Sequence, residues 1–364
     1  MERFWTFGAL FLGSLVLFGD ACLYHCLSRE HCDEQAPILN FNQPYYRTNR
    51  CRPSEVCCKT PRQNNPVRCD LYPENNHPNI APTINPSKPY YPTNYGAENQ
   101  PCGKSNPNEE MEWYHFNNLT TPGEYPWVVA LFKNGKFLAG GSLIAPGVVL
   151  TAAHLVKYET KDKIIVRAGE WDLNSNREGF QFEEREVEKI VWHERFDFQT
   201  GANNIALLFL KSKFQLKNHI RTICLPSPTT SFEGHRCIVA GWGKTYPTDP
   251  SHSTILKRVT LPIIKRSTCE QQLRRTNLGW SYQLPESLIC AGGELNQDAC
   301  IGDGGSALFC SIGARNSDVY MQVGIVNWGI DCGKENVPAT YTDVAMFREW
   351  IEKNLLDFNY NYYN

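Results

Sequence analysis

The chain has 364 residues, of which 20% are charged and 41% are hydrophobic, and a formal net charge of -2. This length suits one large domain with a smaller one, and the balanced charge argues against nucleic acid or another polyanion as a partner. Fifteen cysteines are too many for an ordinary cytosolic protein and are typical of a disulfide-built protein outside the cell.

Residues 1–21 are expected to form a secretory signal peptide. The chain opens with charged residues, continues as a mostly apolar run from Phe4 to Phe18, and offers small residues for cleavage before Cys22. The alternative is a membrane anchor. The run is too short to span a bilayer, and no second apolar stretch of about 20 residues follows. We therefore expect a secreted, extracellular protein with no membrane partner.

Residues 22–58 are dense in cysteine and poor in apolar residues. Because so few apolar residues cannot build a core, three disulfides are expected to hold this segment together. A zinc site is the alternative, but thiols are oxidised outside the cell and no C-x-x-C pair occurs here. The six cysteines are Cys22, Cys26, Cys32, Cys51, Cys57 and Cys58.

Residues 59–101 are expected to form a linker. Proline, asparagine and tyrosine recur and apolar periodicity is absent, so the segment should be extended and exposed. It contains Cys69, which stands apart from the six cysteines before it and the eight after it. Cys69 is expected to bridge to another chain, to rearrange with a neighbouring pair, or to stay free.

Residues 102–357 are expected to form a β domain. Short runs such as WVVALF and IALLFL are rich in β-branched and aromatic residues and are bounded by Gly, Pro and Asn, as strands are. So many short strands favour a sandwich or a barrel. Near the end, apolar residues between Val344 and Leu355 recur at helical spacing and predict a C-terminal helix. Residues 358–364 are predicted to be a frayed tail.

Three stretches resemble the motifs around the catalytic residues of trypsin-like and chymotrypsin-like serine proteases: VLTAAHLV with His154, NNIALLFL with Asn204, and CIGDGGSAL with Gly304. VAGWGKT and GIVNWGIDCG are further family stretches in the expected order, and residues 22–58 resemble the clip domain of arthropod proteases. The whole chain resembles the clip-domain serine protease homologues of insects. This resemblance implies an all-β fold of two antiparallel six-stranded barrels (chymotrypsin-like) with a C-terminal helix, preceded by a small disulfide-rich clip module.

The resemblance also implies that catalysis is lost. The family mechanism needs a serine oxygen, an imidazole that takes its proton, and a carboxylate that fixes the imidazole tautomer. His154 is retained, but Asn204 replaces the carboxylate and Gly304 replaces the serine. Loss of the serine alone costs on the order of 10⁶ in rate in a true enzyme. Two alternatives stay open: Ser306 as a substitute nucleophile, and water attack assisted by His154.

Activation by proteolysis is also missing from the pattern. Zymogens of the family are cut after Arg or Lys, and the new amine pairs with the aspartate before the serine, here Asp303. No Arg or Lys occurs between Ser105 and Phe132, so no trypsin-like cut frees an amine there. Asp303, if buried, must find hydrogen bonds elsewhere. We expect the surrounding pocket to stay disordered or zymogen-like.

The specificity pocket implied by the resemblance is incomplete. Asp298 matches the carboxylate that selects Arg or Lys in trypsin-like enzymes, and Gly329 matches one pocket wall. Ala339 replaces the glycine of the other wall, and Asn327 replaces a serine. We expect a remnant without a ligand. A residual slot for Arg or Lys is the alternative.

The resemblance pairs all eight cysteines of the large domain. One family disulfide beside the histidine is absent, with Ala139 and Leu155 in its places, which indicates an apolar contact instead of a crosslink. The implied pairs are Cys102–Cys224, Cys237–Cys310, Cys269–Cys290 and Cys300–Cys332.

Two weaker signals concern modification and metal. Asn118-Leu119-Thr120 is an acceptor sequence for N-glycosylation. Glu170, Asp172 and Glu178 lie in a loop where several family members bind calcium, although the spacing matches imperfectly. We expect a solvated acidic loop, with calcium as the alternative, and no other cofactor.

Three functions compete. The first is a non-catalytic binding, cofactor or regulatory protein in an extracellular protease cascade of the prophenoloxidase type. Its partners would be other secreted proteins, namely clip proteases or their zymogen substrates, or a microbial surface. The second is a structural or adhesion protein of matrix or reproductive fluid. The third is a serine endopeptidase with residual activity.

Overall fold

The computed structural model describes the backbone of residues 25–28, 32–35, 55–61, 102–107, 118–175, 179–312 and 318–362, and it describes side chains only between residues 102 and 358 of these ranges. Contacts divide the chain into two compact units, Met1–Thr83 and Ile84–Asn364. The expected signal peptide, the linker beyond residue 61 and Cys69 lie outside the described residues.

Three short strands of the first unit form an antiparallel sheet with the order β1-β3-β2. They are β1 (His25–Ser28), β2 (Cys32–Gln35) and β3 (Glu55–Pro61). β3 continues three residues past the boundary expected at residue 58, because Thr60 and Pro61 pair with Glu34 and Cys32 of β2. The pairing of the six clip cysteines lies outside the described side chains.

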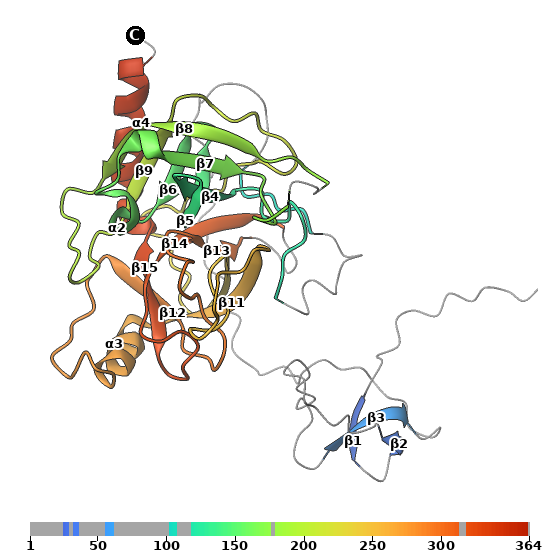
Figure 1. Cartoon of the computed structure of the whole chain (residues 1–364). Helices are drawn as coiled ribbons and strands as arrows, with labels where there is room; N and C mark the ends of the chain where they lie inside the picture. The colour runs from blue at the N-terminus through green and yellow to red at the C-terminus, as the bar shows by residue number, and fades with distance from the viewer. Residues whose placement is uncertain are drawn as a thin grey trace, which may run out of the picture. The chain divides into compact units, whose positions relative to one another are not determined.

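The second unit contains two closed antiparallel barrels of six strands each (Figure 1), which confirms the expected all-β fold. The first has the strand order β4-β5-β6-β9-β8-β7 and the second has the order β10-β11-β12-β15-β14-β13. The strands are β4 (Val128–Lys133), β5 (Lys136–Ala145), β6 (Val148–Thr151), β7 (Ile164–Ala168), β8 (Glu183–Trp192), β9 (Ala206–Leu210), β10 (Arg236–Gly241), β11 (Lys257–Ile264), β12 (Leu288–Gly292), β13 (Ala307–Ser311), β14 (Tyr320–Trp328) and β15 (Pro338–Asp343).

Local sequence explains how these strands form. Asn134 and Gly135 both have positive φ, and Lys133 pairs with Lys136 across them, so the two residues form the tight turn between β4 and β5. In β7, buried and half-buried residues alternate, as they do in a strand with one face toward a core. Neither barrel has a free edge, because each sheet closes on itself.

Three apolar clusters fix the barrels and their junction. One fills the first barrel around Leu131, Val149 and Leu208, and a second fills the second barrel around Leu261, Leu308 and Tyr341. The third joins the barrels. Its members include Trp127 and Phe309, whose rings meet edge to face with centroids 5.2 Å apart. The junction between the barrels is therefore a packed core.

Helices are few in the described residues. They are α2 (Ala153–Val156), α3 (Arg266–Arg274) and α4 (Arg348–Tyr362), with 3-10 turns η3 (Lys161–Lys163) and η4 (Ala345–Phe347). The expected C-terminal helix is present, but the frayed tail from residue 358 is wrong, because α4 continues to Tyr362. Phe358 stacks on Phe209 of β9 with ring centroids 4.2 Å apart, and this contact stabilises the last turns.

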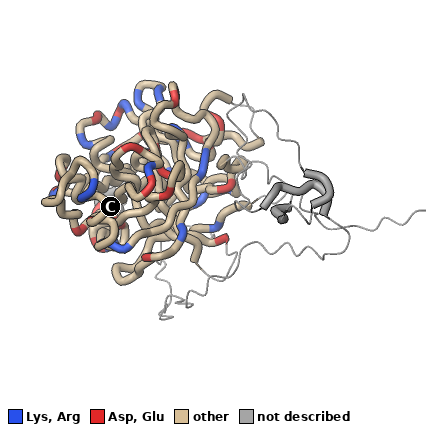
Figure 2. The backbone as a smooth tube through the Cα atoms, turned by 90° about the horizontal axis from the view of Figure 1, so that it is seen from below, with Lys and Arg blue, Asp and Glu red and all other residues tan. Residues whose placement is uncertain are grey.

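The structure contains the four disulfides that the resemblance implies: Cys102–Cys224, Cys237–Cys310, Cys269–Cys290 and Cys300–Cys332. Where the family has a fifth, Ala139 is buried in the core of the first barrel and Leu155 packs against that core. Charged residues of both signs are interspersed over the described part of the large unit (Figure 2).

Candidate functional site

Three loops at the junction of the barrels bring the family motifs together. His154 lies on α2, just after β6, and Asn204 lies just before β9. Because Thr151 at the end of β6 pairs with Ala206 at the start of β9, both residues lie at the same end of the first barrel. Gly304 comes from the second barrel, just before β13. A Cβ atom at Gly304 would lie 3.7 Å from Nε2 of His154.

Asn204 holds the histidine in place. Its Oδ1 accepts a hydrogen bond from the backbone N–H of His154 at 2.9 Å, and its Nδ2 lies 2.8 Å from Nδ1 of the same residue. The amide also donates to Oδ1 of Asn327 at 2.6 Å. Burial lowers the pKa of His154, so the ring is neutral at physiological pH.

This arrangement provides neither a nucleophile nor the usual base. Glycine has no hydroxyl, and the amide nitrogen of Asn204 faces Nδ1, where a carboxylate would accept a hydrogen bond from Nδ1–H. Ser306 does not replace the serine. It is only 1% exposed, its hydroxyl points at Gly140, and that hydroxyl has no hydrogen-bond partner in the described part of the chain. The hydroxyl is therefore buried and not open to a substrate.

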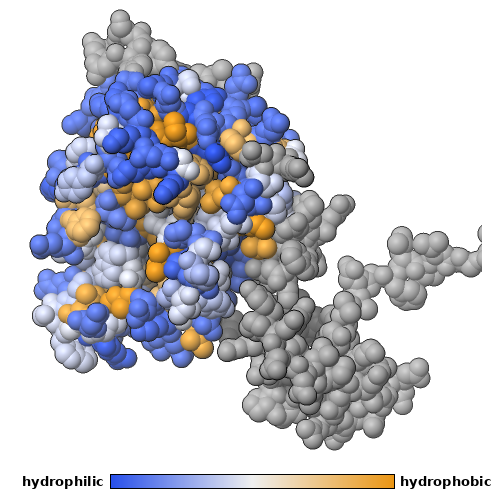
Figure 3. Space-filling view, viewed as in Figure 1, coloured by the Kyte–Doolittle hydropathy of each residue, from blue (hydrophilic) through white to orange (hydrophobic). Residues whose placement is uncertain are grey.

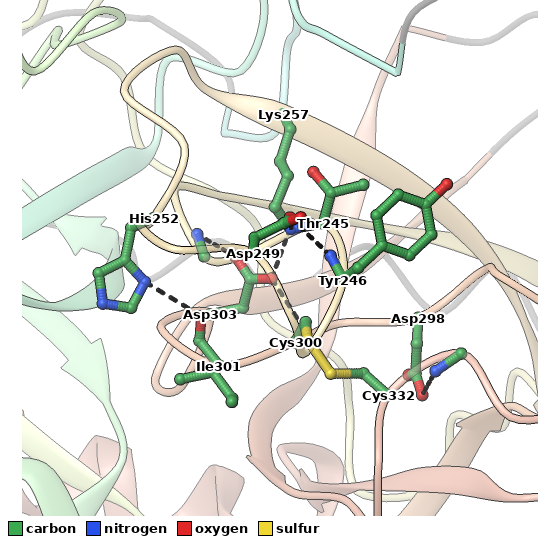
Figure 4. Close-up of a disulfide and its surroundings, with 12 residues drawn as sticks. Thr245, Tyr246, Asp249, His252, Lys257, Asp298, Cys300, Ile301, Asp303 and Cys332 are labelled. Carbon is green, nitrogen blue, oxygen red and sulfur yellow. Dashed lines mark hydrogen bonds and ion pairs between the residues drawn. A yellow bond between two sulfur atoms is a disulfide. The ribbon is translucent and has the colours of Figure 1, made fainter. Parts of the chain in front are cut away.

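Asp303, next to Gly304, finds its partners inside the protein (Figure 4). Its carboxylate accepts hydrogen bonds from the backbone N–H groups of Gly243 at 2.8 Å and Cys300 at 3.0 Å. Lys257 of β11 places its ammonium 2.6 Å from the same carboxylate, and both side chains are buried. In this turn an internal lysine supplies the cation that proteolysis cannot, so the carboxylate is paired without an activating cut.

The two residues before Asp303 in the same turn also have contacts that fix them. The carbonyl oxygen of Ile301 accepts from the backbone N–H of Lys244 at 2.8 Å, and it lies 3.2 Å from Nδ1 of His252 (Figure 4). Gly302 has a φ of +98°, and the ring of His252 occupies the space that a side chain there would need. Position 302 therefore requires glycine for two reasons: its backbone conformation and the close approach of the His252 ring.

The residues that match the family's specificity pocket make separate contacts. Asp298 accepts a hydrogen bond from the backbone N–H of Gly333 at 3.1 Å, and burial raises the pKa of its carboxyl to about 6. Ala339 is buried, and its methyl group would lie 3.4 Å from a Cβ atom at Gly329, so the two residues face each other. Asn327 instead accepts a hydrogen bond from Asn204, the residue that contacts His154.

The expected acidic loop is only partly described, because Glu178 lies outside the described residues. Glu170 pairs with Arg167 at 2.8 Å and accepts from the backbone N–H of Trp171 at 2.9 Å. One oxygen of Asp172 accepts from the backbone N–H of Asn174 at 3.2 Å. Among the described residues, no group of three or more His, Cys, Asp or Glu side chains could hold a metal ion.

The remaining features concern the surface. Asn118 is exposed, whereas Thr120 of the same acceptor sequence is buried and its hydroxyl donates to the carbonyl of Leu256 at 3.1 Å.

No helix in the described part of the chain has the length and apolar character needed to cross a membrane.

Sequence reasoning missed Lys257 and His252. The signal for Lys257 was present, because strand residues two apart share a face and Lys257 lies on the face of Leu261 and Ile263, which are buried. A lysine on an inward face needs a buried anion. His252 lies in an irregular loop, and no pattern in the sequence pointed to it.

The two barrels, with a histidine facing a glycine at their junction, define a trypsin-like domain without a serine hydroxyl. A family model described as trypsin matches residues 117–351. The inactive CLIP domain-containing serine protease A28 of Anopheles gambiae is 38% identical over 271 residues, covering 72% of this chain and 69% of the relative. Phenoloxidase-activating factor 2 of Galleria mellonella is 41% identical over 245 residues, covering 63% and 80%. The chain belongs to the trypsin family and, within it, to the inactive clip-domain serine protease homologues of insects.

Proposed function

We propose that this protein is a secreted, non-catalytic cofactor or regulator in an extracellular protease cascade that leads to phenoloxidase activation. One observation carries the proposal: a trypsin-like domain with two closed barrels has Gly304, which lacks a hydroxyl, opposite His154. The fold is retained, whereas the group that would attack a peptide bond is missing. Relatives named phenoloxidase-activating factors 2 and 3, from Galleria mellonella and Holotrichia diomphalia, support a role in such a cascade.

Exposed aromatic residues beside the site support a protein partner. Tyr158 and Phe198 are 78% and 68% exposed, and the ammonium of Lys157 lies within 5.4 Å of the ring centroids of Tyr158 and Phe196. These residues lie on the segment after α2, which carries His154, and on the loop after β8. Small apolar groups interrupt the hydrophilic surface of the face in Figure 3. Aromatic side chains are enriched at protein interfaces.

The partners that we propose are active clip proteases or their zymogen substrates, with a microbial surface as the second choice. We also propose the organisation inferred from sequence: a signal peptide in residues 1–21, a clip module from Cys22, a linker, the non-catalytic domain, and a glycan on Asn118. Secretion from insect cells should yield a mature chain that begins at Cys22, and glycosidase treatment should lower its mass. An unshifted mass would remove the glycan from this proposal.

A reconstituted cascade tests the function directly. An active clip protease and prophenoloxidase are mixed with or without the protein, and phenoloxidase activity is measured. We expect the wild type to change the activity and the Tyr158→Ser/Phe198→Ser variant to lose the effect. Trp280→Ser is the matched control, because Trp280 is 78% exposed on a loop of the other barrel. No effect of the wild type, together with no binding to either component, would contradict the proposal.

A further inference from the structure

A lysine on the surface of the first barrel lies over aromatic rings and lacks a carboxylate partner. The ammonium of Lys157 is 5.4 Å from the ring centroid of Tyr158 and 5.3 Å from that of Phe196, within the range of a cation–π contact. No Asp or Glu among the described residues forms an ion pair with it, whereas Lys133 of the same barrel pairs with Glu159 at 2.7 Å. The positive charge of Lys157 is therefore not compensated within the described part of the chain.

Two of the aromatic side chains around this lysine are exposed to solvent. They are Tyr158 and Phe198, and most of each side chain is accessible. Phe196 is buried, and its ring lies edge to face against Phe198 with centroids 6.3 Å apart. Because Phe196 contacts both Lys157 and Phe198, the four residues form one continuous surface, which we name the Lys157 cluster. Joined exposed apolar groups of this kind mark interaction sites, whereas single ones do not.

The loop that carries Phe198 is closed by its own hydrogen bonds. The carboxylate of Asp197 accepts from the hydroxyl of Thr200 at 2.6 Å and from the backbone N–H of Gln199 at 3.0 Å. The backbone N–H of Gly201 donates to the carbonyl of Asp197 at 3.0 Å. The one acid between the two phenylalanines is thus used inside its own loop and does not neutralise the lysine.

The segment that carries Tyr158 is also held by backbone hydrogen bonds. The N–H of Lys157 donates to the carbonyl of Ala153 at 2.9 Å, and the N–H of Glu159 donates to the carbonyl of Val156 at 3.0 Å. Both exposed rings therefore lie on segments that are fixed before a partner arrives. Such preorganisation lowers the entropy that is lost on binding.

We propose that the Lys157 cluster binds an acidic segment of a partner protein, in which an Asp or Glu lies beside a large apolar side chain. The proposal rests on the proposed function, because it names the chemistry of the partner that the aromatic surface takes. The carboxylate of the segment pairs with the ammonium of Lys157, and the apolar side chain packs against Tyr158 and Phe198.

Charge and ring exposure together favour this occupant over two others. A basic segment would be repelled by the uncompensated lysine. An anionic lipid surface is recognised by several neighbouring cations, whereas this cluster contributes a single lysine. A protein segment uses both features, because it brings a carboxylate to the lysine and an apolar group to the rings.

The first test uses three fluorescein-labelled peptides that differ only in charge: Glu-Glu-Phe-Leu-Glu, Gln-Gln-Phe-Leu-Gln and Lys-Lys-Phe-Leu-Lys, all with blocked ends. Fluorescence anisotropy with the full chain measures their affinities. We expect the acidic peptide to bind about tenfold more tightly than the glutamine peptide and to weaken as salt is added, and we expect no binding of the lysine peptide. No binding of the acidic peptide, or equal affinity for the acidic and glutamine peptides, would overturn the proposal.

Variants of the lysine assign the charge contact. Lys157→Met keeps an unbranched chain over the rings and removes the charge, so the affinity for the acidic peptide should fall about tenfold and lose its salt dependence. Lys157→Arg keeps the charge and should keep the affinity. Lys163→Met is the matched control, because Lys163 is an exposed lysine of the same barrel outside the cluster. An affinity of Lys157→Met equal to that of the wild type would overturn the proposal.

Variants of the rings assign the apolar contact. Tyr158→Ser and Phe198→Ser should each weaken the acidic peptide several-fold, whereas Tyr158→Phe keeps the ring and should bind like the wild type. The same loss in Tyr158→Phe and Tyr158→Ser would contradict the ring contact. Vesicles of phosphatidylglycerol are tested beside the peptides. Vesicle binding that Lys157→Met removes, without any peptide binding, would assign the cluster to a lipid surface and overturn the protein partner.

The Lys157→Met variant in the reconstituted cascade separates the two proposals. If it loses both the acidic peptide and the effect on phenoloxidase activity, both hold. If the wild type acts in the cascade but binds no acidic peptide, or if Lys157→Met loses the peptide but keeps the cascade effect, the acidic partner fails and the proposed function stands. If the peptide binds as expected but the wild type leaves the cascade unchanged, the proposed function fails and the recognition of acidic segments stands.

Discussion

The ammonium of Lys257 lies 2.6 Å from the buried carboxylate of Asp303. Lys257 begins β11, whereas Asp303 lies in the turn before β13, so the pair joins two parts of the second barrel (Figure 4). It places an internal cation where a cleaved zymogen of the family would use its new amine. The turn beside His154 is therefore held without proteolysis.

Replacing Lys257 with Met should lower the free energy of unfolding by about 3–5 kcal/mol, because it leaves a buried charge unpaired. Lys161→Met is the control. Its partner Glu188 is partly exposed, and such pairs contribute about 0–1 kcal/mol. Urea denaturation measures both, and Lys257→Met/Asp303→Asn should recover part of the loss. Equal stability of the two single variants would show that the buried pair has no special role.

Purified protein should neither hydrolyse Arg or Lys ester substrates nor become labelled by a serine-directed fluorophosphonate. The reason is that Gly304 has no hydroxyl and Ser306 is buried with its hydroxyl against Gly140. Turnover is compared with heat-killed protein, and labelling is compared with the Ser306→Ala variant. Labelling that disappears in Ser306→Ala would identify a nucleophile that we exclude.

Restoring Gly304→Ser and Asn204→Asp together should give little activity on Arg or Lys substrates. Lys257 already holds the turn, so we assign the remaining obstruction to the methyl group of Ala339, which faces Gly329. Adding Ala339→Gly should raise kcat/KM at least tenfold over the double variant. High activity of the double variant, or no gain in the triple, would show that Ala339 is not the obstruction.

Asp298 should make stability fall as the pH rises. Its pKa is about 6 in the folded protein, against 3.8 for an ordinary aspartate, mainly because of burial. Below about pH 4 the carboxyl is protonated in both the folded and the unfolded state and does not lower the stability. Above pH 6 it is ionised in both states, and the full cost of burying the charge lowers the free energy of unfolding. Asp298→Asn should remove at most about 2–3 kcal/mol of that penalty at pH 7.5 and little at pH 4. Thermal unfolding at both pH values measures the difference, and a variant whose stability differs from that of the wild type by the same amount at each pH would contradict it.

Much of the fold followed from local patterns. Short β-branched runs bounded by turn residues predicted the strands, and ordered family motifs predicted the two barrels and all four disulfides of the large unit. The end of the C-terminal helix was predicted less well. α4 continues to Tyr362, and stacking of Phe358 on Phe209 holds its last turns against β9.

The sequence by itself determined that position 304 has no hydroxyl and position 204 no carboxylate, since side-chain chemistry is read directly from residue type. Only the tertiary structure decided what replaces them. Asn327, 123 residues away from Asn204, accepts a hydrogen bond from the Asn204 amide and so helps to orient it against His154. Lys257 compensates Asp303 across 46 residues of chain. Such partners depend on which groups burial brings together, because a polar group withdrawn from water must pair with whatever donor or acceptor the fold places beside it.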